Sequence, residues 1–83
     1  MLHLVKIDPD ANQWRYYYLD VWPTLFGEWT VRREWGRIGS GGGQTLMRTC
    51  ETEEEARRLA TAKAAEKQRR GYTIAPSSHN WIA

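Results

Sequence analysis

The fold is decided by residues Gln13–Trp22, which read QWRYYYLDVW. Aromatic and β-branched side chains favour a pleated, extended backbone, so this stretch predicts a long β-strand. Alternate residues of a strand point to opposite faces of the sheet, and we expect one set to face the core: Tyr17, Leu19 and Val21. The other set is also aromatic, which implies that the second face is at least partly covered: Trp14, Tyr16 and Tyr18.

The flanking sequence predicts further strands of an antiparallel meander. Three segments carry strand-like patterns: Leu2–Ile7, Glu28–Trp35 and Gln44–Cys50. The run Asp8–Asn12 has strong turn chemistry, and five of the eight residues in Gly36–Gly43 are glycine, which indicates a loop. Arg33 interrupts the apolar face of its segment, so we expect the strand to twist or bulge there.

A helix follows the sheet. Thr52–Glu55 reads TEEE, a capping box in which side-chain oxygens bind free amides of the first turn, and Gly71 is a natural end. An apolar stripe at helical spacing would pack on the sheet: Ala56, Leu59, Ala60 and Ala64. The expected fold is α+β, with about four antiparallel strands and one C-terminal helix. Residues 2–73 form the domain, and residues 74–83 form a tail or an edge strand anchored by Trp81.

Composition limits the classes of protein that fit. The 83 residues suffice for one core, and five Trp, four Tyr and one Phe supply its bulk. A single cysteine, Cys50, excludes an internal disulfide and a thiolate metal cluster. The start of the chain lacks a signal-like apolar core, and no apolar run approaches the roughly 20 residues of a membrane span. We therefore expect a soluble, cytoplasmic protein without a membrane partner.

The side chains that could support catalysis are scattered along the chain. His3 and His79 lie near opposite ends, and neither is spaced to share a metal with Cys50 or the acids. Glu53–Glu55 are consecutive helical residues that point in different directions, so they do not form a carboxylate pair. The sequence predicts no enzyme, no cofactor and no metal site.

The start of the glycine-rich loop has chemistry suited to binding. Trp35 offers a flat indole for a sugar or base, Gly36 allows a backbone to approach, and Arg37 can hold a phosphate with paired hydrogen bonds. The competing interpretation is a buried Trp beside a surface Arg. The loop could cradle a phosphate, but it lacks a Gly-Lys-Ser/Thr ending and joins two strands, so a plain hairpin connection is simpler.

Basic residues gather in the second half of the helix. The net charge is only +2, yet six basic residues lie between Arg57 and Arg70 against one acid, Glu66. The helix end offers a basic and aromatic patch: Lys67, Arg69, Arg70 and Tyr72. Basic residues at a helix C-terminus also compensate the helix dipole, so a purely structural role explains them equally well.

Three motifs in order resemble the WGR domain, a family found in poly(ADP-ribose) polymerases and in bacterial proteins. Trp35–Gly39 reads WGRIG, Asn12–Tyr17 is similar to the start of the family's long strand, and Glu66–Tyr72 resembles the helix end of bacterial members. The resemblance covers roughly residues 2 to 73. One departure is Cys50, where the family usually has an aromatic residue.

The resemblance implies a sheet with a helix packed on it and a role in binding nucleic acid. In the polymerases the domain helps to bind DNA breaks, with the motif's Trp on a terminal sugar and its Arg at DNA and interdomain contacts. This implies such roles for Trp35 and Arg37, and also for Asn12 and Tyr72. It does not extend to ADP-ribosylation, which belongs to a separate catalytic domain.

The resulting hypothesis is a module that binds nucleic acid, duplex DNA or DNA ends. It requires Trp35 to share one face with the cations of the motif and the helix end: Arg37, Lys67, Arg69 and Arg70. The alternative is a protein-interaction or regulatory module that uses the aromatic face of Gln13–Trp22, with Trp35 and Arg37 recognising a partner protein. That alternative is favoured if Trp14 and Tyr16 form one exposed apolar patch.

Overall fold

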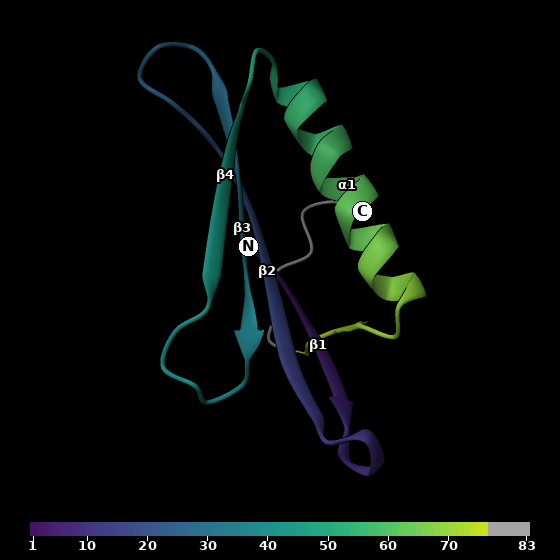
Figure 1. The fold of residues 1–83 in the computed structure, drawn as a ribbon. Helices are drawn as coiled ribbons and strands as arrows, with labels where there is room; N and C mark the ends of the chain where they lie inside the picture. Colours follow the sequence, from purple (N-terminus) through teal and green to yellow (C-terminus); the bar gives the residue numbers. More distant parts are fainter. Residues whose placement is uncertain (77–83) are drawn as a thin grey trace.

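One antiparallel sheet carries a single helix on one of its faces, as Figure 1 shows. This computed structural model describes residues 1–76. The five strands lie in the order β4-β3-β2-β1-β5, and the α+β architecture expected from the sequence is confirmed. The elements are β1 (Leu2–Asp8), the short 3-10 helix η1 (Pro9–Ala11), β2 (Gln13–Pro23), β3 (Trp29–Arg37), β4 (Gln44–Cys50), α1 (Glu53–Arg69) and β5 (Thr73–Ile74).

Strand β2 lies at the centre of the sheet and sets its register. Tyr17 lies opposite Leu4 of β1 and Trp35 of β3, so these three side chains share the face toward α1. The face expected for the core is confirmed for Tyr17 and Leu19, which are almost fully buried, whereas Val21 is partly buried against the core. The other almost fully buried residues of this face are Leu2, Leu4, Val31 and Cys50. Cys50 occupies a core position, where a free cysteine is well accommodated because its side chain behaves as a small apolar group.

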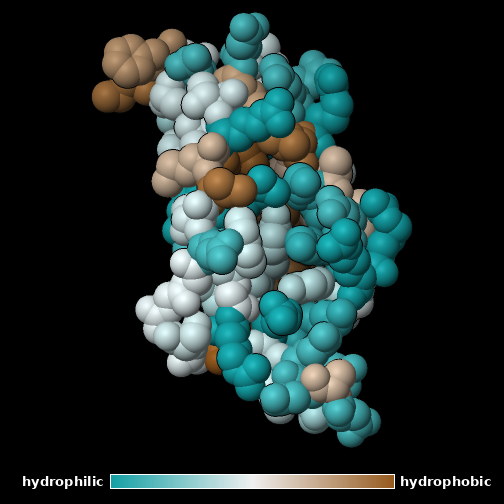
Figure 2. Space-filling model, in the orientation of Figure 1, coloured by the Kyte–Doolittle hydropathy of each residue, from teal (hydrophilic) through white to brown (hydrophobic). Residues whose placement is uncertain are grey.

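The helix begins where the sequence predicted. The Thr52 hydroxyl accepts a hydrogen bond from the Glu55 amide at 3.1 Å. Ala56, Ala60 and Ala64 are buried, and their small side chains let α1 lie close to the large residues of the sheet. Figure 2 shows the outward surface of α1 as hydrophilic, in keeping with a helix that is apolar only on its narrow inner stripe.

After the helix the chain turns back to the far edge of the sheet. Gly71 has φ +98°, a left-handed conformation that glycine adopts without steric cost. The turn lets β5 pair with β1 through Leu4 and Val5, so the sheet has a short fifth strand in addition to the four expected. Residue Trp81, the expected anchor of this segment, lies outside the described residues.

A bulge at Arg33, one of the two irregularities expected there, is absent from the strand pairing. Pairing of β3 with β2 and β4 is continuous through this position, where Arg33 lies opposite Leu19 and Leu46. The strand keeps its register because the guanidinium occupies space at the helix–sheet boundary and does not displace the backbone. A basic, half-buried side chain therefore remains on the face that packs against α1.

Candidate nucleic-acid interface

Trp35 lies in an aromatic cluster on the helix side of the sheet. Its ring is stacked near Tyr17, with centroids 6.1 Å apart and planes 21° from parallel. The Lys67 ammonium of α1 lies 4.9 Å from the Tyr17 ring centroid and 5.6 Å from that of Tyr72. The fold thus brings together three residues that the sequence proposed for binding: Trp35, Lys67 and Tyr72. Tyr17, the ring that joins them, was expected only in the core.

A row of three cations crosses the sheet next to this cluster. Lys6 of β1 lies opposite Arg15 of β2, and Arg15 lies opposite Arg37 of β3. Each is two residues from a member of the Leu4–Tyr17–Trp35 row, so all three side chains belong to the same face. Like charges directly opposite one another weaken an antiparallel pair. Among residues 1–76, none of the three forms an ion pair with an acid. The cation row is therefore suited to an external polyanion.

Sequence reasoning singled out Arg37 and missed Lys6 and Arg15. Alternation already placed Arg15 on the face of Tyr17, which was an available signal. Lys6 lies beside Arg15 because of the register between β1 and β2, and no local sequence pattern encodes that register.

Arg37 is held at the start of the loop by backbone and side-chain contacts. The Ile38 amide donates to the Trp14 carbonyl at 2.7 Å, which extends the β2–β3 ladder past Arg37. One guanidinium nitrogen donates to Asn12 Oδ1 at 3.4 Å. Asn12 has φ +53° and ends η1, so the turn between β1 and β2 presents its side chain to Arg37. The structure thus places Asn12 beside Arg37.

Gly36 serves the packing of the loop. It lies on the opposite face from Trp35 and Arg37, paired with Tyr16. A Cβ there would lie 3.1 Å from the Gly43 Cα and 3.2 Å from the Tyr16 ring. The close approach that glycine permits is therefore made by parts of this chain. The Ser40 hydroxyl lies 2.8 Å from the Arg37 carbonyl oxygen, and the loop joins β3 to β4 as a hairpin connection.

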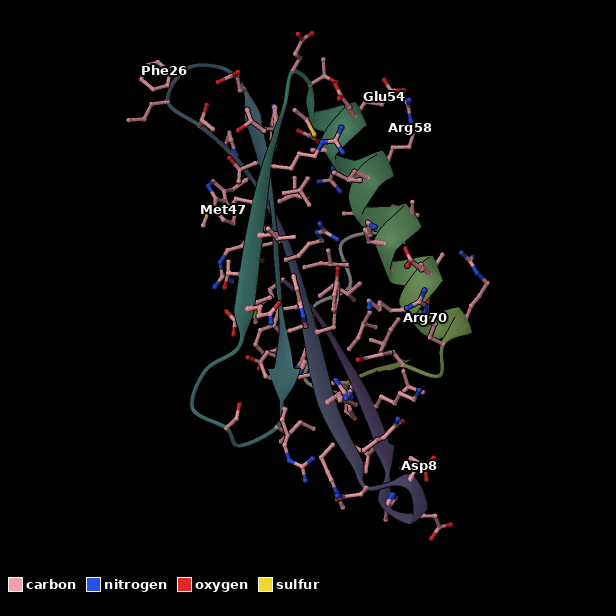
Figure 3. The ribbon with its side chains drawn as sticks, in the orientation of Figure 1. Asp8, Phe26, Met47, Glu54, Arg58 and Arg70 are labelled. Atoms are coloured by element: carbon pink, nitrogen blue, oxygen red, sulfur yellow. The ribbon has the colours of Figure 1, made fainter. Side chains whose placement is uncertain are left out.

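The last two basic residues, Arg69 and Arg70, are exposed at the end of the helix. Arg70 is exposed and pairs with Glu66 at 3.7 Å, and Figure 3 shows it at the end of α1. Arg69 is also exposed. Within the described part of the chain, no hydrogen bond, ion pair or ring contact joins either residue to Trp35 or Arg37. The helix therefore contributes Lys67 to the aromatic cluster, and no described contact adds Arg69 or Arg70 to it.

The opposite face of the sheet does not present the apolar patch that the alternative hypothesis requires. Trp14 is 37% exposed, but Tyr16 is only 9% exposed and donates its hydroxyl to Glu34 at 3.0 Å. Hydrogen bonds from Arg32 and then from Tyr16 hold the pKa of the Glu34 carboxyl below its usual value. A hollow of about 460 Å³ is lined by Tyr16 and Glu34, by Tyr18 and by the loop residues Arg37 to Gly42.

Among residues 1–76, no group of three or more His, Cys, Asp or Glu side chains is placed to hold a metal ion. No helix of this range has the length and hydropathy needed to cross a membrane.

A sheet with one helix, an aromatic cluster and a row of unpaired cations defines a small α+β binding domain. The WGR domain model matches residues 1–79, and the chain belongs to the WGR domain family. WGR domains are binding modules and not catalytic ones.

A relative is known from Sinorhizobium fredii (strain NBRC 101917 / NGR234), where it is called "Uncharacterized protein y4dW". It is 40% identical over 76 residues, which cover 92% of this chain and 37% of that protein. The chain thus spans little more than a third of the length of the curated relative it matches. No solved structure matches this sequence.

Proposed function

We propose that this domain binds nucleic acid, duplex DNA and its ends in particular, on the helix side of the sheet. The observation that carries the proposal is the cation row beside Trp35. Lys6, Arg15 and Arg37 occupy neighbouring strands, and strands lie about 4.8 Å apart, so the row spans roughly 10 Å. Phosphate groups of a nucleic-acid backbone would relieve the mutual repulsion of these charges.

Trp35 would supply the contact that is not electrostatic. It is half-buried, so part of its indole remains open to a ligand while the rest is fixed against Tyr17. In the poly(ADP-ribose) polymerases that this domain resembles, the Trp of the motif packs on a terminal sugar. A rigid, pre-placed ring loses little conformational entropy on binding, which supports a stacking role here.

The aromatic-face alternative is weaker. Tyr16 is buried, so Trp14 and Tyr16 do not form one exposed patch. The face toward α1 offers charge and stacking together, and the opposite face offers an internally paired Arg32–Glu34–Tyr16 system.

Replacement of Arg37 tests the proposal directly. We expect Arg37→Ala to weaken binding of a 5′-phosphorylated duplex about tenfold at low salt, because a charge-assisted phosphate contact is lost. With two or three phosphate contacts, the wild-type log–log salt slope should be about −2 to −3 and should fall by about 1 in the variant. Fluorescence anisotropy at several salt concentrations gives both values.

Arg48→Ala is the matched control. Arg48 lies on the same face of the sheet, opposite Val31, but three residues of β4 separate it from Gln44 at the loop. It should bind as the wild type does. Absence of binding at low salt, or equal losses in the two variants, would contradict the proposal.

A further inference from the structure

A small pocket lies between α1 and the sheet, next to Trp35. Its volume is about 90 Å³. Three strand residues and three helix residues line it: Tyr17, Arg33, Trp35, Lys63, Glu66 and Lys67. It therefore combines three cations with one carboxylate at the boundary between helix and sheet.

Arg33 is the first indication that the pocket takes an anion. It stands on a face otherwise used for the core, half-buried and in regular register. Within residues 1–76 its guanidinium forms no ion pair with a carboxylate. A guanidinium taken out of water without a partner is costly, and natural structures usually supply an acceptor.

The Tyr17 hydroxyl is the second, independent indication. Tyr17 is 2% exposed, and its oxygen has no hydrogen-bond partner among the described residues. Burial raises the pKa of this hydroxyl, and the neighbouring Arg33 charge opposes that rise. The hydroxyl thus remains a proton donor at neutral pH. A buried donor without an acceptor, lining the same pocket as an unpaired guanidinium, calls for an acceptor in that pocket.

The pocket's carboxylate does not fill this role. Glu66 is engaged by Lys63 at 3.5 Å and by Arg70 at 3.7 Å, both on its own helix. Lys67 lies over the rings of Tyr17 and Tyr72. Burial lowers the pKa of the Lys67 ammonium, and the charges of Arg70, Lys63 and Arg33 lower it further against the opposing effect of Glu66. Positive charge is therefore in excess around the pocket.

We propose that this pocket binds one tetrahedral oxyanion of the phosphate class, held by Arg33 and Lys67 and by a hydrogen bond from the Tyr17 hydroxyl. The planar guanidinium donates in parallel to two oxygens of such an anion. The volume accommodates several waters or one tetrahedral oxyanion, and it is too small for a nucleotide. A nucleic-acid phosphate and free inorganic phosphate share this chemistry, and only the first source rests on the proposed function.

The two sources are distinguished by titrating the full chain with two probes. The first is sodium phosphate against sodium chloride at equal ionic strength, and the second is a 5′-phosphorylated duplex. The ¹H–¹⁵N signals of the Trp35 indole and the Arg33 guanidinium report on the pocket, and the thermal midpoint reports on stabilisation by a bound anion. The variant is Arg33→Gln, and Arg48→Gln is the matched control on the same sheet face.

We expect at least one probe to shift the Trp35 and Arg33 signals saturably in wild type and Arg48→Gln, with affinity about tenfold lower in Arg33→Gln. If these signals respond to phosphate and the duplex does not bind, the oxyanion site is supported and only the proposed function is contradicted. Response to the duplex alone would assign a backbone phosphate as the source. Unchanged affinity for both probes in Arg33→Gln, or no saturable shift with either, would overturn the site.

A second variant covers a loss of folding in Arg33→Gln. Lys67→Met keeps an apolar stem against Tyr17 and Tyr72 and removes the charge. It should give the same weakening of the effective probe. Wild-type affinity in a folded Lys67→Met protein would overturn the proposed set of ligands.

Discussion

At the residue scale, the glycines of the β3–β4 connection differ in what surrounds them. A Cβ on Gly43 would collide with the Trp35 carbonyl group and lie 2.5 Å from the Tyr16 hydroxyl. A Cβ on Gly36 would meet Tyr16 and Gly43 at a slightly longer distance, and one on Gly42 would meet nothing within 4 Å. Only two of these glycines are therefore required by packing, and both support the backbone on which Trp35 and Arg37 stand.

We expect Gly43→Ala to destabilise the domain by about 1–3 kcal/mol, because an extra carbon is forced into filled space. Gly36→Ala should cost less, and Gly42→Ala should stay within about 0.5 kcal/mol of the wild type. Urea unfolding followed by tryptophan fluorescence measures all three. Equal stabilities of Gly43→Ala and Gly42→Ala would show that the loop is not packed as described.

Glu34 gives the sheet face opposite the helix a dependence on pH. Its pKa lies below the usual 4.5 because Arg32 and then Tyr16 donate to its carboxylate. A carboxyl with a lowered folded-state pKa stabilises the fold above its unfolded-state pKa and loses that contribution as the pH falls through the folded value. Stability should therefore decrease on the acid side of pH 4.5.

Glu34→Gln should remove part of this acid dependence and lower stability at neutral pH. Unfolding free energies measured between about pH 3 and pH 7 test the expectation. Glu54→Gln is the control, since Glu54 is 82% exposed and its ion pair within the described residues is with Arg58, one turn along the helix. Identical pH profiles for wild type and Glu34→Gln would rule out the assigned role.

At the element scale, the sequence was informative wherever a pattern is local. The Thr52 cap, the alanine stripe and the alternation in Gln13–Trp22 each depend on residues close together in the sequence, and the structure confirms them. The cation row and the Arg33 pocket could not be predicted in this way. Each is assembled from different elements, and a shift of one residue in strand register would have moved Arg15 to the opposite face.

The cap of α1 can be tested alone. Thr52→Ala removes the acceptor for the Glu55 amide, and we expect a loss of about 1 kcal/mol. Thr61→Ala is the matched control, because Thr61 is an exposed residue within α1 and alanine is the better helix former. Thermal or urea unfolding should place the two variants on opposite sides of the wild type.

At the scale of the whole molecule, two surfaces of different character lie at opposite ends. The β2–β3 loop exposes Leu25 (98%) and Phe26 (87%), visible as a hydrophobic projection in Figure 2. Figure 3 places Phe26 at one end of the molecule and Asp8, near the turn that carries Asn12, at the other. The cation row belongs to the end away from Phe26.

This separation leads to an expectation for the loop. Phe26→Ser should leave stability within about 0.5 kcal/mol of the wild type, because an exposed ring contributes little to the core. Affinity for a phosphorylated duplex should also be unchanged. A duplex affinity that falls as it does in Arg37→Ala would place the nucleic acid along the whole sheet instead of at one end.

The pairing of β5 with β1 has a consequence for the order of events in folding. The hairpins β1–β2, β2–β3 and β3–β4 join neighbours in the chain, whereas Val5 meets Thr73 only after the two ends close on each other. Long-range closures are entropically slow and tend to form late. We expect Tyr72, which precedes β5, to pack against Tyr17 of β2 in the same step. The surface around Trp35 is thus completed when the chain closes, and a ligand held there would slow the reopening of the terminal strand.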